Sequence, residues 1–142
     1  MTNISSSSGF GSIRVDTPLV LPGQRVGIMG GTFNPPHDGH RIVAETALKR
    51  LNLDQLWWLV TPGNPLKENG RLPSQAERMA QSRNFARSPR IRITGLEAEL
   101  RTPYTAATLA FLLQRYPSVH FVWVMGADNL AGFDRWQNWQ GI

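Results

Sequence analysis

Short runs of apolar residues recur along the chain and predict the buried strands of a sheet. These runs cover residues 26–29, 56–60, 91–93 and 119–125. The second run contains the neighbours Trp57 and Trp58, whose side chains point to opposite faces of a strand. A strand that is apolar on both faces belongs in a sheet covered on both faces, which favours a parallel sheet with helices packed on each side.

Between these runs, apolar residues recur at helical spacing and predict three helices. They are expected over residues 39–51, over residues 73–87, and from Thr102, Pro103 or Thr105 up to Pro117. Asp38 is expected to cap the first helix. The predicted buried face of the first helix comprises Ile42, Val43, Ala47, Leu48 and Leu51, and that of the third comprises Ala106, Leu109, Ala110, Leu112 and Leu113.

The alternation of strands and helices predicts an α/β fold, a Rossmann-like parallel sheet with helices on both faces and right-handed crossovers. This domain is expected over residues 25–142, after a flexible Ser/Gly/Pro-containing tail at residues 1–24. Ligands of such sheets bind beyond the carboxyl ends of the strands. The pattern therefore predicts a site near Gly30-Gly31, Thr61-Pro62 and Gly126-Ala127-Asp128.

The composition excludes several functional classes. The 142 residues include no cysteine, which excludes disulfides, thiolate metal sites and cysteine nucleophiles. No apolar run approaches the ~18 residues that a membrane-spanning helix needs. The formal net charge of +5 favours an anionic partner, either nucleic acid, an acidic membrane or a phosphorylated small molecule.

Most of the positive charge lies between Arg71 and Arg101. Seven arginines in this stretch face three glutamates, which gives it +4 of the total +5. A solvated surface is the simplest interpretation, and a local contact with phosphate or with a partner is an alternative. A nucleic-acid-binding stripe is less favoured, because base stacking needs aromatic side chains and Phe85 is the only aromatic residue among these arginines.

The most informative segment runs from Gly30 to His40 and reads Gly-Gly-Thr-Phe-Asn-Pro-Pro-His-Asp-Gly-His. Two glycines at a strand end allow another group to approach the backbone closely. The helix that follows offers free amides and a dipole, both of which favour phosphate. His37 and His40 are three residues apart and share one face of this helix start. Two ordinary surface histidines are the alternative, and a metal pair lacks a further ligand at suitable spacing.

This segment resembles the signature Gly-x-Phe-x-Pro-x-His-x-Gly-His of the nucleotidyltransferase superfamily. Later segments narrow the resemblance, namely 61–67, 101–109 and 126–130, followed by Phe133, Trp136 and Trp139. Together they are similar to the bacterial nicotinate-nucleotide adenylyltransferases over about residues 25–142. The resemblance implies a cytoplasmic enzyme of NAD biosynthesis that joins ATP and nicotinate mononucleotide into deamido-NAD and pyrophosphate.

The resemblance also implies a mechanism and an ATP site. The mononucleotide phosphate attacks the α-phosphorus of ATP in line, without a covalent enzyme intermediate. His37 and His40 are the implied catalytic residues, which hold the ATP phosphates and stabilise the developing charge. The implied ATP-binding residues are Gly30, Gly31, Thr32, Phe33, His37, His40, Gly126 and Asp128. Mg²⁺ is expected to arrive with ATP, and no metal site of the protein itself is expected.

Four further residues are implied in mononucleotide binding. Lys67 reaches a substrate phosphate, amides near Tyr104 and Thr105 bind the nicotinate carboxylate, and Trp136 stacks on the pyridine ring. Each has an ordinary alternative, respectively a solvated loop lysine, a helix start, and core packing. For Asp128, a hydrogen bond to a ribose hydroxyl and a cap of the following helix are both open.

The sequence departs from the family in two places. Asn34 stands where the family often has aspartate, so a turn-stabilising role is expected there and a metal-binding carboxylate is not. The late Ser-Thr-x-x-Arg segment of the family, which contacts ATP phosphates, has no counterpart, so the resemblance implies a domain truncated at its C-terminus. The alternatives are a non-catalytic nucleotide-binding module and a basic nucleic-acid-binding α/β domain, although no nucleic-acid or membrane partner is expected.

Overall fold

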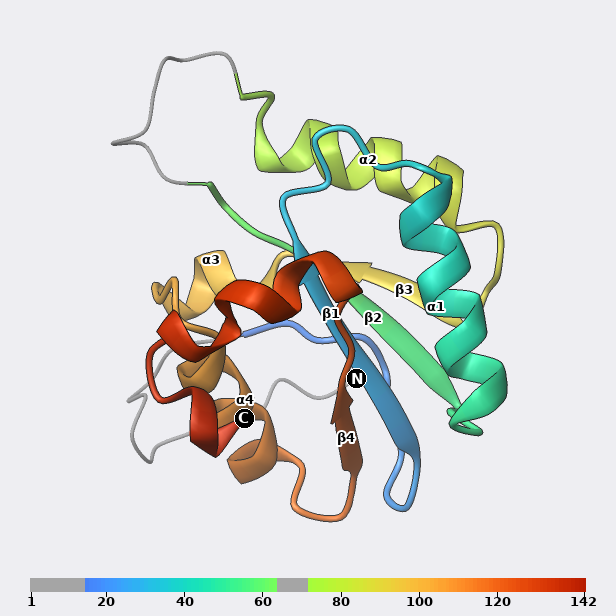
Figure 1. The fold of residues 1–142 in the computed structure, drawn as a ribbon. Helices are drawn as coiled ribbons and strands as arrows, with labels where there is room; N and C mark the ends of the chain where they lie inside the picture. Colours follow the sequence, from blue (N-terminus) through green and yellow to red (C-terminus); the bar gives the residue numbers. More distant parts are fainter. Residues whose placement is uncertain (1–14, 64–71) are drawn as a thin grey trace.

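The computed structural model describes residues 15–63 and 72–142. Its centre is a four-stranded sheet in which every pair of neighbouring strands is parallel (Figure 1). The strands are β1 (Arg25–Gly31), β2 (Gln55–Val60), β3 (Ile91–Thr94) and β4 (His120–Trp123), in the order β3-β2-β1-β4. The predicted α/β fold with a parallel sheet is therefore confirmed, and β4 is shorter than the run at 119–125 that predicted it.

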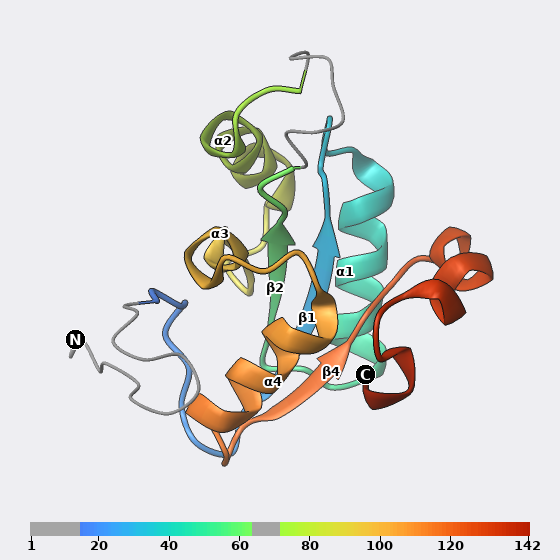
Figure 2. The same cartoon turned by 90° about the vertical axis from the view of Figure 1, so that its left-hand side faces the viewer.

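Helices cover both faces of the sheet, as Figure 2 shows from its edge. The helices are α1 (Asp38–Arg50), α2 (Gln75–Ala86), α3 (Leu96–Leu100) and α4 (Thr105–Arg115), followed by the 3₁₀ helices η1 (Ala127–Arg135) and η2 (Trp139–Gly141). One apolar cluster packs α1 and α2 on the sheet, and a second packs α3 and α4 on its opposite face. Sequence periodicity missed α3, because five residues are too few to show a helical repeat.

Strand β2 lies in the middle of this core, and all six of its residues are buried. Trp58 belongs to the cluster under α1 and α2, whereas Trp57 belongs to the cluster under α3 and α4. The two tryptophans thus face opposite sides of the sheet, as predicted from their adjacency. Because β2 pairs in parallel with β1 and with β3, the carboxyl ends of these three strands lie at the same edge of the sheet.

Residues 15–24 differ from the predicted tail, because they pack on the domain. Val15 is buried in the cluster that contains α4, and the Thr17 hydroxyl is hydrogen-bonded to the Tyr116 hydroxyl. The side-chain amide of Gln55 donates to the Leu19 carbonyl at 3.0 Å. Scattered apolar side chains and single hydrogen bonds hold this segment in place. Such isolated contacts form no hydrophobic pattern from which the sequence could predict them. Residues 1–14 of the predicted tail lie outside the described residues.

The buried faces of two helices also differ from the prediction. In α1 and its C-cap, the predicted Ile42 and Leu51 are exposed, and the buried positions include Ala44, which the prediction had not selected. In α4 the predicted Ala110 and Leu113 are exposed, and the buried positions include Thr108. Burial of this hydroxyl is tolerated because Thr108 Oγ1 donates to a carboxylate at 3.0 Å.

Candidate active site

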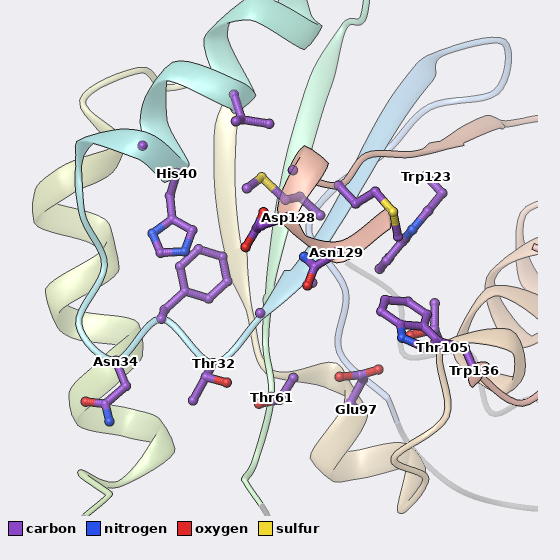
Figure 3. A pocket seen from close by; sticks show the side chains of 18 of the residues that line it. Thr32, Asn34, His40, Thr61, Glu97, Thr105, Trp123, Asp128, Asn129 and Trp136 are labelled. Atoms are coloured by element: carbon purple, nitrogen blue, oxygen red, sulfur yellow. The ribbon is translucent and has the colours of Figure 1, made fainter. Parts of the chain in front are cut away.

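A cavity of about 1070 Å³ opens at the carboxyl ends of β1, β2 and β4 (Figure 3). Predicted site residues line this strand-end cavity, namely Gly30, Gly31, Thr32, Phe33, His37, His40, Tyr104, Thr105, Gly126, Asp128 and Trp136. Lys67 lies outside the described residues. Asn34 lies on the cavity wall with an exposed side chain. Residues far apart in sequence are therefore brought around one space, while their individual roles stay predictions.

The two histidines form the start of α1. His37, and not the predicted Asp38, is the N-cap residue, and its Nδ1 accepts a hydrogen bond from the Gly39 amide at 3.1 Å. In return, the His37 amide donates to Nδ1 of His40 at 3.1 Å. An imidazole nitrogen that accepts a hydrogen bond carries no proton, so each neutral ring has its proton on Nε2. The turn thus provides two imidazole N–H donors at the wall of the cavity.

Close packing holds the histidine rings in place. Their centroids are 3.9 Å apart in a stacked arrangement. A Cβ atom on Gly39 would lie 2.8 Å from Cε1 of His37, so the glycine makes room for this ring. On the other side, the buried Phe33 ring lies 4.5 Å from the His40 ring, centroid to centroid. The side chain of Phe33 therefore supports His40, a role additional to the backbone contact that the sequence predicts.

The surroundings of His40 favour the neutral form of its ring. Burial lowers the pKa of His40 below its ordinary value, and the neighbouring His37 lowers it further. Asp128 acts in the opposite sense and raises this pKa. Asp128 and His40, both labelled in Figure 3, line the same cavity. A neutral imidazole that donates from Nε2 suits a phosphate oxygen, which accepts hydrogen bonds.

The start of α4 forms another part of the cavity wall. Tyr104 is the N-cap residue of α4, so Pro103 precedes the helix instead of lying in its first turn. No side chain caps this helix start. The Tyr104 amide donates to Thr102 Oγ1 at 3.2 Å, and the first intrahelical bond runs from the Thr108 amide to the Tyr104 carbonyl. The amides of Thr105 and the next two residues therefore have no partner within the helix. Of the two predicted amides, that of Thr105 is the one available to an anion.

Glu97 is a cavity residue that the sequence analysis did not select. Its side chain is 5% exposed, and Oε2 accepts a hydrogen bond from Thr108 Oγ1 at 3.0 Å. Burial raises the pKa of Glu97, and the bond from Thr108 partly offsets this effect. In the sequence, Glu97 is one of three acidic residues among many arginines, so nothing distinguishes it from a surface charge.

An aromatic wall closes the side of the cavity next to β4. The Trp136 ring lies edge-on to Trp123 at 5.9 Å and to Phe133 at 5.1 Å, centroid to centroid. A Cβ atom on Gly30 would lie 3.2 Å from Trp123 Cη2, so the close approach predicted at this glycine is made by an indole ring of the chain itself. Trp136 is partly buried and lines the cavity, so it both packs on Phe133 and presents a surface to a ligand.

The structure also bears on the capping role of Asp128 and on the distribution of the arginines. The N-cap of η1 is Gly126 and no side chain caps this helix, so the capping role considered for Asp128 is not observed. The arginines do not form one continuous surface, because Arg78 is fully buried and Arg90 donates to the carbonyls of Leu53 and Asp54. Arg71 lies outside the described residues.

The described part of the chain holds no group of three or more His, Asp or Glu side chains placed to bind a metal ion. Within the same residues, no helix is long and apolar enough to cross a membrane.

Comparison with known proteins identifies the family. Residues 28–142 match the family model described as cytidylyltransferase-like. The chain belongs to the cytidylyltransferase-like family. This family assignment agrees with the resemblance of the Gly30–His40 segment to the nucleotidyltransferase signature, and with the position of that segment at the end of β1.

Relatives of this family member carry more specific names. A protein of Rhizobium johnstonii named "Probable nicotinate-nucleotide adenylyltransferase" is 58% identical over 120 residues, which are 84% of this chain and 60% of the relative. A protein of Rhizobium meliloti with the same name is 60% identical over 117 residues, covering 82% of this chain and 62% of the relative. The chain thus spans about 60% of the length of these curated relatives.

A solved structure shares the fold. The nicotinic acid mononucleotide adenylyltransferase of Plasmodium falciparum, complexed with NaAD, superposes with a TM-score of 0.71 at 18% identity. The superposition covers 82% of this chain and 58% of that protein. At this level of identity, the comparison supports the nucleotidyltransferase-like fold and does not extend to the ligand.

Proposed function

We propose that the protein transfers the adenylyl group of ATP to nicotinate mononucleotide, giving deamido-NAD and pyrophosphate. A phosphate oxygen of the mononucleotide attacks the α-phosphorus of ATP, a new P–O bond forms, and the bond to the pyrophosphate oxygen breaks. The nucleophile is already ionised, so no side chain has to remove a proton from it. Catalysis then depends on positioning the reactants and on neutralising their charge.

The turn after β1 would hold the ATP phosphates. His37 and His40 would donate hydrogen bonds from Nε2, supported by backbone amides of Gly30, Gly31, Thr32 and Phe33. ATP enters as its magnesium complex, so Mg²⁺ is part of the substrate in this proposal. Gly126 and Asp128 would contribute to ATP binding from the turn after β4, where Asp128 would bind a ribose hydroxyl.

The mononucleotide would lie toward α4 and the aromatic wall. The free amides at the start of α4 favour a carboxylate, and the exposed part of Trp136 offers a face for the pyridine ring. Lys67 would contact the mononucleotide phosphate from the loop after β2. We also expect the enzyme to work in the cytoplasm.

One observation carries this proposal. The strand-end cavity has the two Nε2–H donors of His37 and His40 on one wall and the uncapped start of α4 on another. Two anion-favouring regions around one space fit a reaction between two phosphorylated substrates, one of which carries a carboxylate. The names of the Rhizobium relatives support the same reaction.

The test is a pyrophosphate-release assay with ATP and nicotinate mononucleotide, and with each substrate omitted in turn. The 142-residue chain is assayed beside a version extended with the remaining part of the Rhizobium johnstonii relative, because that relative is longer. Pyrophosphate release that requires both substrates supports the proposal. Its absence from both proteins contradicts it.

The other functional classes give different results in the same experiment. Tight binding of both nucleotides without pyrophosphate release, in either version, would indicate a non-catalytic binding module. Salt-dependent binding to random duplex DNA, with no nucleotide binding, would indicate a basic nucleic-acid-binding domain.

A further inference from the structure

A buried arginine joins two of the turns that border the strand-end cavity. Arg78 lies on α2 and its side chain is 0% exposed. Its Nη1 donates to the carbonyls of Thr32 at 2.9 Å and Thr61 at 2.7 Å, and its Nη2 donates to the carbonyl of Pro62 at 3.2 Å. Nε donates to the Pro73 carbonyl at 2.9 Å. The guanidinium thus connects the turn after β1 with the turn after β2.

The charge of Arg78 has no carboxylate partner among the described residues, whose two ion pairs both involve Arg41. Backbone carbonyls satisfy four of its five N–H donors. Burying a cation in this way is costly even when its donors are satisfied, and an apolar side chain of similar volume would fill the same space without that cost. Filling the core therefore does not explain an arginine at this position.

The orientation of one peptide shows what Arg78 achieves. In a trans peptide the C=O and N–H groups point in opposite directions. Because the Thr32 carbonyl points at Arg78, the Phe33 N–H points away from the guanidinium. Thr32, Phe33 and Thr61 all line the cavity. Phe33 also has a φ of 51°, in the left-handed region that a bulky residue adopts only when its surroundings enforce it.

We propose that Arg78 is a positioning residue of the strand-end cavity. It fixes the Thr32–Phe33 peptide and the Thr61 turn so that their polar groups are arranged for a nucleotide phosphate, and its positive charge favours an anion nearby. The nature of the ligand rests on the proposed function. The fixing of the two turns does not, and it is measurable without any ligand.

The test compares Arg78→Gln and Arg78→Lys with Arg83→Gln, a matched control at an exposed position of the same helix. The ATP dissociation constant is measured by calorimetry at a temperature at which each variant is folded. Arg78→Gln is expected to weaken binding by about tenfold to a hundredfold, the range expected when a hydrogen bond to a charged phosphate is lost. Arg78→Lys retains the charge but loses the planar set of guanidinium N–H donors, so its ATP dissociation constant should lie between those of Arg78→Gln and the parent. Arg83→Gln should stay within about twofold of the parent.

Amide hydrogen exchange of the ligand-free proteins provides the second measurement. In both Arg78 variants, the Thr61 amide, which donates to the Gly31 carbonyl at 2.9 Å and so links the two turns, should exchange at least about tenfold faster. The amides in the middle of β2 should keep their protection. A loss of stability alone would not weaken ATP binding by the folded molecules, and it would not confine faster exchange to the Thr61 amide. If Arg78→Gln does not fold, Arg78→Lys carries both measurements.

The results separate the two proposals. If the parent protein binds no nucleotide, the proposed function is contradicted and hydrogen exchange alone decides the role of Arg78. Unchanged exchange of the Thr61 amide in a folded Arg78 variant overturns the positioning role, whatever happens to binding. Unchanged ATP affinity, in a parent that does bind ATP, overturns it as well.

Discussion

The rings of His37 and His40 stack with their centroids 3.9 Å apart, and each ring accepts a backbone amide hydrogen bond through Nδ1. The turn therefore determines which nitrogen carries the proton, and only Nε2 is left to donate. In His37 the same side chain caps α1 and offers a donor to the cavity. The two tasks use different nitrogens, so substitutions can separate them.

Replacing His37 tests this separation. His37→Ala should lower the free energy of unfolding by about 1 kcal/mol, because α1 loses its N-cap. His37→Asn keeps an oxygen that can accept the Gly39 amide, so its stability should stay close to that of the parent. Neither variant has the Nε2 donor, so both should slow pyrophosphate release by at least ~10². Urea denaturation and the pyrophosphate assay measure the two effects, and full activity of His37→Asn would contradict the donor role.

Gly39 offers a test that leaves the histidines in place. In Gly39→Ala the new Cβ would lie 2.8 Å from His37 Cε1, so the ring must move. Alanine favours a helix over glycine by about 1 kcal/mol, so stability should hold while turnover falls at least about tenfold. The control is Gly132→Ala, where a Cβ meets nothing within 4 Å. Equal activity of the two variants would show that the position of the His37 ring is unimportant.

The lowered pKa of His40 predicts how stability depends on pH. Burial and His37 disfavour its protonation in the folded state, and Asp128 opposes them only in part. The unfolded chain therefore binds the proton more readily, and the free energy of unfolding falls as pH drops below the ordinary histidine pKa of about 6.5. Urea denaturation at about pH 7.5 and about pH 5.5 should show a smaller pH effect in His40→Gln than in the parent. His120→Gln, at an exposed position, is the control and should keep the pH effect of the parent.

Much of the fold was predictable because the strands of a parallel sheet are continuous apolar runs. Trp57 and Trp58 show this most clearly, since their adjacency alone places them on opposite faces of β2. The turn between Gly30 and His40 was also predictable, because its glycines and histidines have a characteristic spacing. The structure brings this turn, the start of α4 and the turn after β4 around one cavity.

The remaining features depend on tertiary contacts that leave no local signal. Arg78 belongs to a basic stretch, and its burial follows from carbonyl groups of turns distant in the sequence. Glu97 is similarly indistinct until Thr108 and the cavity wall surround it. Val15 packs as a single apolar residue in a polar segment. Hydrophobic periodicity cannot detect a buried charge or one isolated contact.

Substrate choice is predicted by the start of α4. Nicotinate mononucleotide should bind more tightly than the nicotinamide analogue, because free helix-start amides stabilise a carboxylate. Calorimetry with the two mononucleotides measures the difference directly. Equal or tighter binding of the nicotinamide compound would remove the nicotinate assignment, and membership of the cytidylyltransferase-like family would be unaffected.

The last prediction concerns the buried carboxyl group of Glu97. Burial raises its pKa in the folded state, so folding favours the protonated form, and the stability this provides is lost as pH rises through the folded pKa. Glu97→Gln removes the charge and keeps an oxygen that can accept the Thr108 hydroxyl. The substitution should therefore raise the free energy of unfolding near pH 8 and change it little near pH 4, where both side chains are neutral. Urea denaturation at the two pH values measures this, with Asp134→Asn, at an exposed position, as control. If Glu97→Gln changes the free energy of unfolding equally at both pH values, ionisation of Glu97 does not destabilise the folded state.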